Sequence, residues 1–209
     1  MAEFPFVTFS NNETHRLADL SGVLHDLRAT SAICAQLRRL MAEDPEKYNL
    51  LEIEALQAAA VIRYCRTYCG GVRTAFKLSR EMLDKLPTEL QEAHREFDAL
   101  RDKHIAHSVN DWELNVPVIY LKVDATRQTY EVSSVSVQNH RIVALAEASI
   151  RQLHELAQTL GAMVENEIDK EKARVLEIAK AMPIEELKKG LHEPAIVPGI
   201  GPREDRRAR

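Results

Sequence analysis

Apolar residues recur at steps of three and four along most of the first half of the chain, as they do on the buried stripe of an amphipathic helix. Asp44-Pro45 ends the first predicted helix, and Gly70-Gly71 breaks the second. The predicted helical segments are about 13–42, about 50–69, a shorter piece over 72–86, and a helix that begins at Thr88. The expected buried stripes are Leu17, Leu20, Leu24, Leu27, Cys34 and Met41 in the first helix, and Leu51, Ala55, Ala58, Ile62, Cys65 and Cys69 in the second.

The middle of the chain changes to segments rich in Val, Ile, Tyr and Ser, which favour strands. Two strands are predicted at about 116–124 and 129–137, joined by a link of hairpin length. The apolar residues of the second strand change parity near Ser133-Ser134, which predicts either a bulge or the end of the strand there. Because an isolated two-stranded ribbon is marginally stable, the hairpin is expected to pack on the helices.

A long helical pattern resumes at about residue 142, and a short helix is predicted at about 184–189. The Pro- and Gly-containing remainder, which ends in arginines, predicts a flexible basic C-terminal tail. The predicted fold class is therefore mainly α. Residues 1–182 are expected to form one helical domain with a small β-hairpin inserted at about 116–137, for which the family resemblance given below implies an up-and-down bundle, and residues 183–209 to form the short helix and the tail.

Composition excludes several classes of protein. The formal net charge of −4 and the pI of about 6.1 argue against a strongly basic nucleic-acid binder. The first residues lack the pattern of a secretory signal, and no apolar run is long enough to span a membrane. The three cysteines form no disulfide framework and fit a reducing compartment. A cytoplasmic protein without membrane partners is expected.

One segment, Arg101-Asp102-Lys103-His104-Ile105-Ala106-His107, has the composition of an active site. The predicted helix from Thr88 begins with a capping box, Thr88-Glu89-Leu90-Gln91. Its apolar stripe continues into His104 and His107, with Arg101 at the edge. Groups that can carry positive charge are costly on a packing face unless they meet an anion, water or other partners. The segment is therefore a candidate for binding an anionic ligand.

Structural alternatives exist for the same residues. A histidine at a helix end often bonds a free carbonyl, and Arg101 could pair with Asp98 or Asp102 on the surface. Two further groups are weaker candidates. Tyr64 and Tyr68 could stack on bases, although a solvated helix face is the default interpretation. Cys65 and Cys69 lie one helical turn apart without a second ligand pair, so they are more easily explained as core residues than as zinc ligands.

The candidate segment resembles a known family. Arg101 and His107, with five residues between them and a polar residue after the arginine, resemble the R-x(4–6)-H signature of the HEPN superfamily. The likeness is greatest to its abortive-infection and toxin branches, and it covers roughly residues 13–180. It implies a HEPN-like helical bundle in which the hairpin is an insertion.

The resemblance also implies an activity. Many members are metal-independent endoribonucleases that act as homodimers, so the expected partners are RNA, a second copy and, for a toxin–antitoxin or phage-defence protein, an antitoxin or a nucleotidyltransferase-type protein. Arg101 would bind the scissile phosphate and His107 would act as general acid or base. Asp102 would orient one of them, and His104 is a possible helper. No metal or other cofactor is expected. The alternatives are a non-catalytic HEPN-like dimerisation or binding module, and an unrelated helical bundle in which the motif is coincidental.

Overall fold

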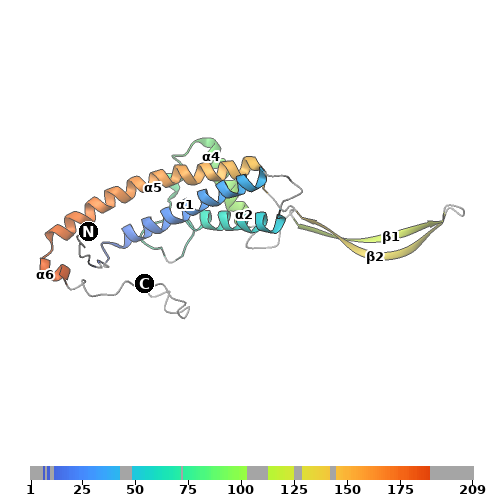
Figure 1. The fold of residues 1–209 in the computed structure, drawn as a ribbon, viewed down its shortest axis with the longest axis horizontal. Coiled ribbons are helices and arrows are strands. Elements are labelled where there is room, and N and C mark those ends of the chain that lie inside the picture. The colour runs from blue at the N-terminus through green and yellow to red at the C-terminus, as the bar shows by residue number, and fades with distance from the viewer. Residues whose placement is uncertain are drawn as a thin grey trace.

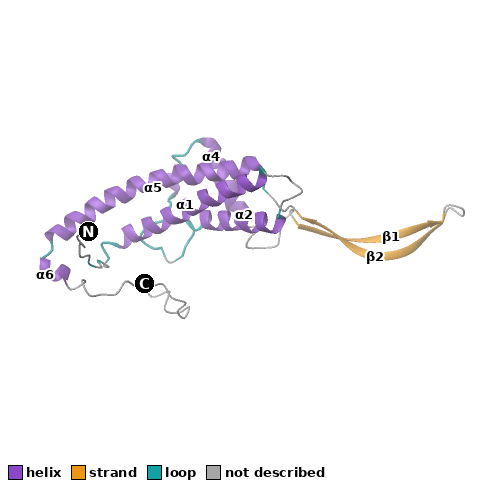
Figure 2. Ribbon diagram, in the orientation of Figure 1, coloured by secondary structure: helices purple, strands orange, loops and turns teal. Residues whose placement is uncertain are grey.

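The computed structural model of the protein describes residues 7, 9, 12–42, 49–71, 73–102, 113–124, 129–141 and 145–188. This part of the chain is mainly helical and contains one antiparallel pair of strands (Figures 1 and 2), as the periodicity predicted. The elements in chain order are α1 (His15–Met41), α2 (Leu50–Cys65), α3 (Arg80–Leu83), α4 (Thr88–Leu100), β1 (Glu113–Asp124), β2 (Thr129–Arg141), α5 (Glu147–Ala181) and α6 (Ile184–Leu187).

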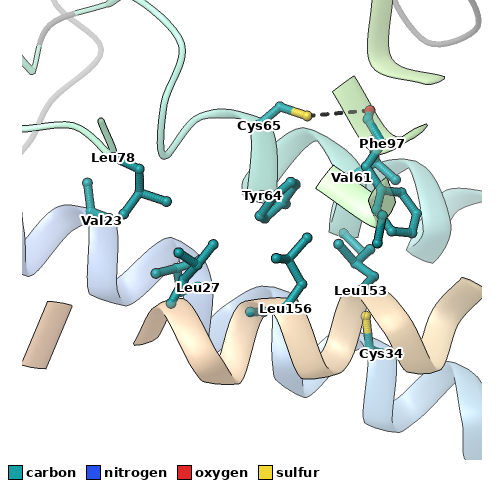
Figure 3. Packing of buried hydrophobic residues seen from close by; sticks show 14 of the residues in the cluster. Val23, Leu27, Cys34, Val61, Tyr64, Cys65, Leu78, Phe97, Leu153 and Leu156 are labelled. Atoms are coloured by element: carbon teal, nitrogen blue, oxygen red, sulfur yellow. Dashed lines mark hydrogen bonds between the residues drawn. The ribbon is translucent and has the colours of Figure 1, made fainter. Parts of the chain in front are cut away.

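Four helices build the core. The two longest, α1 and α5, lie along each other, and α2 and α4 pack against them (Figure 1). Their buried side chains are almost all aliphatic or aromatic, and they meet in one continuous cluster (Figure 3). Burying one such Leu, Ile or Phe contributes roughly 1.5–3 kcal/mol relative to exposing it. The helical body therefore has a complete core of its own.

The stripe predicted for α1 is confirmed at its four central residues, with Leu17 and Met41 partly buried, whereas the stripe predicted for α2 is wrong except at Cys65. Leu20, Leu24, Leu27 and Cys34 are buried in α1. In α2, Leu51 is 75% exposed and Ile62 is 42% exposed. The buried residues of α2 are instead Ile53, Gln57, Ala60, Val61, Tyr64 and Cys65. Apolar residues occur around most of α2, so periodicity could not decide which side faces α1 and α4.

The predicted helical piece over 72–86 is mostly not helical. Only α3 forms a helical turn there, and α2 ends at Cys65. The 73–79 segment has its hydrogen bonds elsewhere: Asp19 of α1 accepts from the backbone N–H groups of Ala75 and Phe76, at 2.8 and 3.2 Å. A side chain distant in sequence therefore replaces the backbone partners that a helix would supply.

The start of α4 is where the sequence placed it, but the capping box does not form. Pro87 precedes the helix, and the Thr88 hydroxyl makes no capping hydrogen bond. The Gln91 side chain instead donates to the carbonyls of Asp84 and Leu86, at 3.1 and 2.8 Å. It thereby joins α4 to the end of the preceding turn.

A buried carboxylate links three parts of the helical body. Asp26 of α1 has a side chain that is only 2% exposed, and three arginines surround it. Arg73 lies 2.7 Å away, Arg63 of α2 3.2 Å and Arg66 3.6 Å. Arg73 also donates to the carbonyls of Gly22 and Arg66. This Asp26 cluster (Asp26, Arg63, Arg66 and Arg73) fixes α2 and the 73–79 segment to α1.

The two strands form a long ribbon that extends away from the helical body (Figure 1). The predicted bulge is confirmed: Tyr120 pairs with Ser134 while Leu121 pairs with Val132, so Ser133 has no partner opposite it. The expected packing of the hairpin on the helices is not found, because most apolar side chains of the ribbon are exposed. The core of the helical body is made by the helices and the 73–86 segment, and no described ribbon residue takes part in it.

The remaining predictions concern the second half of the chain. The long helix α5 begins at Glu147, later than the expected start near 142, and α6 agrees with the predicted short helix. The predicted tail from residue 189 onward lies outside the described residues. Among the helices that the structure describes, none is both long enough and apolar enough to span a membrane.

We expect Asp26→Asn to lower the free energy of unfolding by about 2 kcal/mol, because the buried side chain then offers the partly exposed arginines only neutral hydrogen bonds in place of charge-assisted ones. Urea denaturation measures this change. Glu165→Gln is the matched control, since it removes an exposed pair between Glu165 and Arg28 at 2.9 Å and should cost less than about 1 kcal/mol. Equal losses in the two variants would contradict a stabilising role for the Asp26 cluster.

Candidate functional site at the end of α4

Arg101 lies at the C-terminal end of α4, where it and Asp102 form a π-helical turn. Its guanidinium donates through Nη1 to the Cys69 sulfur at 2.8 Å, and through Nη2 to the Asp102 carboxylate. Its Nε is buried and has no hydrogen-bond partner among the residues that the structure describes. The Arg101 side chain is 31% exposed and that of Asp102 is 56% exposed. The guanidinium is thus oriented from the protein side and reachable from solvent.

The cysteines beside Arg101 are neutral thiols. Burial raises the pKa of Cys65 to about 12, and burial also raises the pKa of Cys69 even though Arg101 opposes the shift. Cys65 donates a weak hydrogen bond to the Phe97 carbonyl at 3.8 Å (Figure 3). Neither thiol has the lowered pKa of a nucleophilic cysteine. Their role here is to pack α2 against α4 and, for Cys69, to accept from Arg101.

A polar network continues from Arg101 along the interface of α2 and α4. The Tyr68 hydroxyl lies 2.9 Å from the Cys65 sulfur and donates to Asp98 at 3.1 Å. The Tyr64 hydroxyl is hydrogen-bonded to His94 Nδ1 at 2.7 Å. Both tyrosine rings make edge contacts with the His94 ring. Burial lowers the pKa of His94, with Asp98 acting in the opposite direction.

The sequence analysis did not select His94, although a signal was available. His94, Asp98 and Arg101 are spaced by four and three residues, which places them on one face of α4. The structure also excludes the base-stacking interpretation of the tyrosines: Tyr64 is fully buried, and Tyr68 packs against the core. The default interpretation of a solvated helix face is wrong for the same reason.

The four predicted site residues fall into two groups. Arg101 and Asp102 are paired with each other, which is one of the structural alternatives foreseen for Arg101. His104 and His107 lie outside the described residues, so the predicted row of Arg101, His104 and His107 stays a prediction. Among the described residues, no group of three or more His, Cys, Asp and Glu side chains has an arrangement that could hold a metal ion.

A groove of about 810 Å³ lies between the segment that follows α2 and the middle of α5. It begins at Gly70, the residue after Cys69, and its charged lining is mainly cationic. Arg16 of α1 lies over the Phe76 ring and pairs with Glu167 at 3.3 Å, whereas Lys77 and Lys85 have no ion pair among the described residues. The charged lining residues are Arg16, Arg73, Lys77, Lys85, Lys170, Glu81 and Glu167.

We expect stability to fall as the pH drops below about 6.5, the ordinary pKa of histidine, because the folded-state pKa of His94 is lower. The unfolded chain then binds a proton that the folded protein does not. The melting temperature should therefore fall between pH 7.5 and 5.5, and fall less in His94→Gln. His25→Gln, at an exposed site on α1, should behave as wild type. An unchanged pH dependence in His94→Gln would contradict the assignment.

Comparisons with known proteins give no information about the site. No protein-family model matches the chain, and neither a curated protein nor a solved structure matches it. The evidence for function is therefore the arrangement of the helices and the environment of Arg101. An oriented, partly exposed guanidinium is suited to binding a phosphate, and the Cys69 that orients it directly precedes Gly70 of the cationic groove.

Proposed function

We propose that the protein is a metal-independent endoribonuclease of toxin or phage-defence type, with a HEPN-like bundle. The observation that carries the proposal is the state of Arg101: Cys69 orients its guanidinium, and its Asp102 pair is exposed to solvent. A phosphate can replace Asp102 without requiring the Cys69 contact to break. A planar, bidentate donor held in this way suits a phosphodiester better than a mobile lysine does.

The proposed reaction is a transfer of the phosphodiester within the RNA. His107 removes the proton of the ribose 2′-hydroxyl, and the oxygen attacks the adjacent phosphorus. The bond to the 5′-oxygen breaks, and that oxygen takes up a proton from a general acid, for which His107 of a second copy is the candidate. The products are a 2′,3′-cyclic phosphate and a 5′-hydroxyl. DNA lacks the attacking hydroxyl and is not a substrate.

The groove offers a path for the rest of an RNA strand. Gly70 lines it and directly follows Cys69, so the groove begins next to the contact that orients Arg101. Lys77 and Lys85 supply positive charge that no described carboxylate neutralises. Affinity for the backbone would come from such lysines, and Arg101 would position the scissile phosphate.

We expect purified protein to cleave RNA in EDTA and to leave 2′,3′-cyclic phosphate ends, and both Arg101→Ala and His107→Ala to lose about 100-fold or more in rate. Arg101→Lys should also be impaired, because lysine keeps the charge but not the planar fork. The assay is cleavage of labelled RNA with identification of the product ends.

Two controls match these variants in residue type. Arg95→Ala removes an exposed arginine on the same helix, and His25→Ala an exposed histidine on α1. Both should retain activity. Cleavage that survives Arg101→Ala and His107→Ala, or its absence over varied RNAs, would rule out the proposed active site.

We expect the double variant Lys77→Ala/Lys85→Ala to bind single-stranded RNA more weakly and with a smaller salt dependence. The slope of log affinity against log salt should fall by about 0.7 for each lost phosphate contact. Fluorescence anisotropy with a labelled oligonucleotide measures it. Lys172→Ala/Lys180→Ala removes two exposed lysines of α5 outside the groove and should leave the slope unchanged. Equal effects of both pairs would exclude the groove as the RNA path.

The second candidate is a non-catalytic HEPN-like binding module, and one observation favours it. Asp102 already pairs with Arg101, so the arginine has a structural partner in the absence of any ligand. A ribbon with exposed apolar residues is also more typical of a protein that binds other chains than of a minimal nuclease. RNA that is bound but never cleaved would support this candidate.

A further inference from the structure

The two faces of the ribbon differ sharply in chemistry. Side chains alternate between faces along each strand, and the register assigns every described pair to one of them. The bulge at Ser133 restores the alternation, so that Leu121 opposite Val132 and Ile119 opposite Val135 share a face. The apolar face consists of Pro117, Ile119, Leu121, Val123, Tyr130, Val132, Val135 and Val137, with Asn115 at its end, and the polar face carries Lys122, Glu131, Ser134, Ser136 and Gln138 together with Val116, Val118 and Tyr120.

The apolar face is uncovered in the single chain. Its large side chains are 51–70% exposed, from Val137 at the lower end to Val132 at the upper. Together they present an apolar patch of at least roughly the 300–600 Å² that is the largest on a typical monomer. Eight of the thirteen exposed large hydrophobic residues in the described part of the chain lie on the ribbon, and seven of these eight on its apolar face. The face is therefore built to be buried.

We propose that the apolar face packs against the same face of a second copy of this chain, so that two ribbons form a four-stranded sandwich about a two-fold axis. The extent of the face supports this occupant, because a standard specific interface buries about 800 Å² per partner and seven large apolar side chains, each more than half exposed, supply a major part of that area. A two-stranded ribbon is marginal alone, whereas two ribbons stacked about 10 Å apart enclose an apolar layer between them. This inference does not depend on the ribonuclease activity.

The chemistry of the face favours a second ribbon over another surface of the same chain. None of the residues on the apolar face whose side chains the structure describes is charged, so bringing this part of the face together in two copies creates no like-charge contact. The pair of opposite charges, Lys122 and Glu131, lies across the strands on the polar face, where it stays in water. The other exposed large hydrophobics are divided between α2, α5 and α6 and offer no patch of similar area.

Sedimentation equilibrium of the full-length protein tests the proposal. Wild type should be a dimer at micromolar concentration. Leu121→Lys and Val132→Glu, which place a charge in the apolar layer, should each weaken dimerisation by about 100-fold or more. Tyr120→Lys and Ser134→Glu introduce the same charges on the polar face and should leave the dissociation constant within a few-fold of wild type. Helical circular dichroism should be unchanged in all four variants, because the helical body has its own core.

Amide hydrogen exchange of the wild type gives a second measurement that needs no variant. Exchange within β1 and β2 should slow as the concentration rises through the dissociation constant, while exchange in α1 and α5 stays constant. A monomeric wild type would overturn the proposal and point to a different protein as the occupant. A dimer that resists the apolar-face charges, or is weakened equally by those on the polar face, would overturn it too.

Discussion

The buried carboxylate of Asp26 is the constraint on which the arrangement of the helical body depends. Removing a carboxylate from water costs several kcal/mol unless partners replace the lost hydration, and three guanidinium groups do so here. Two come from α2 and the residue that follows it, and the third, Arg73, comes from the next segment of the chain. Satisfying one charge therefore positions three separate stretches of backbone. Arg73 also binds backbone carbonyls, which a lysine could not do with the same fixed geometry.

The Asp26 cluster also affects the candidate site, because it fixes the segments that surround Arg101 and the groove. Once Arg73 is held, the 73–79 segment lies across α1, Phe76 and Leu78 enter the core, and the groove forms between this segment and α5. The same end of α2 supplies Cys69 to Arg101. Burial lowers the pKa of Arg101, but the hydrogen bond to Asp102 and the neighbouring negative potential raise it more, so the net direction is upward. A permanent cation held by a weak sulfur acceptor and an exposed carboxylate is well placed to exchange Asp102 for a stronger anion.

The features predicted correctly from the sequence are those that depend on the local spacing of apolar residues. The four core helices and the hairpin follow from spacing, because each depends on residues near one another in the chain, and spacing also gave the bulge at Ser133 as one of two alternatives. The 73–79 segment was missed because its partners, Asp19 and Asp26, lie about fifty residues earlier and carry no local sign of the pairing. Asp102 was predicted as an orienting residue and does pair with Arg101. His94 was missed because its polar environment comes from α2, and only the three-dimensional packing brings Tyr64 and Tyr68 to it.

The ribbon and the helical body differ in where their apolar side chains lie: those of the body are mostly buried within the chain, and those of the ribbon are mostly exposed. In the body, the core closes within one chain, and the long helices leave only scattered apolar residues outside. In the ribbon, strand pairing satisfies the backbone between the strands, yet the apolar face gains nothing from the monomer because no element covers it. In a fully solvated hairpin either face could be polar. Such a hairpin would not need its apolar residues to stay on one face on both sides of a bulge. The bulge is therefore best understood as a device that keeps one face continuous for an interface.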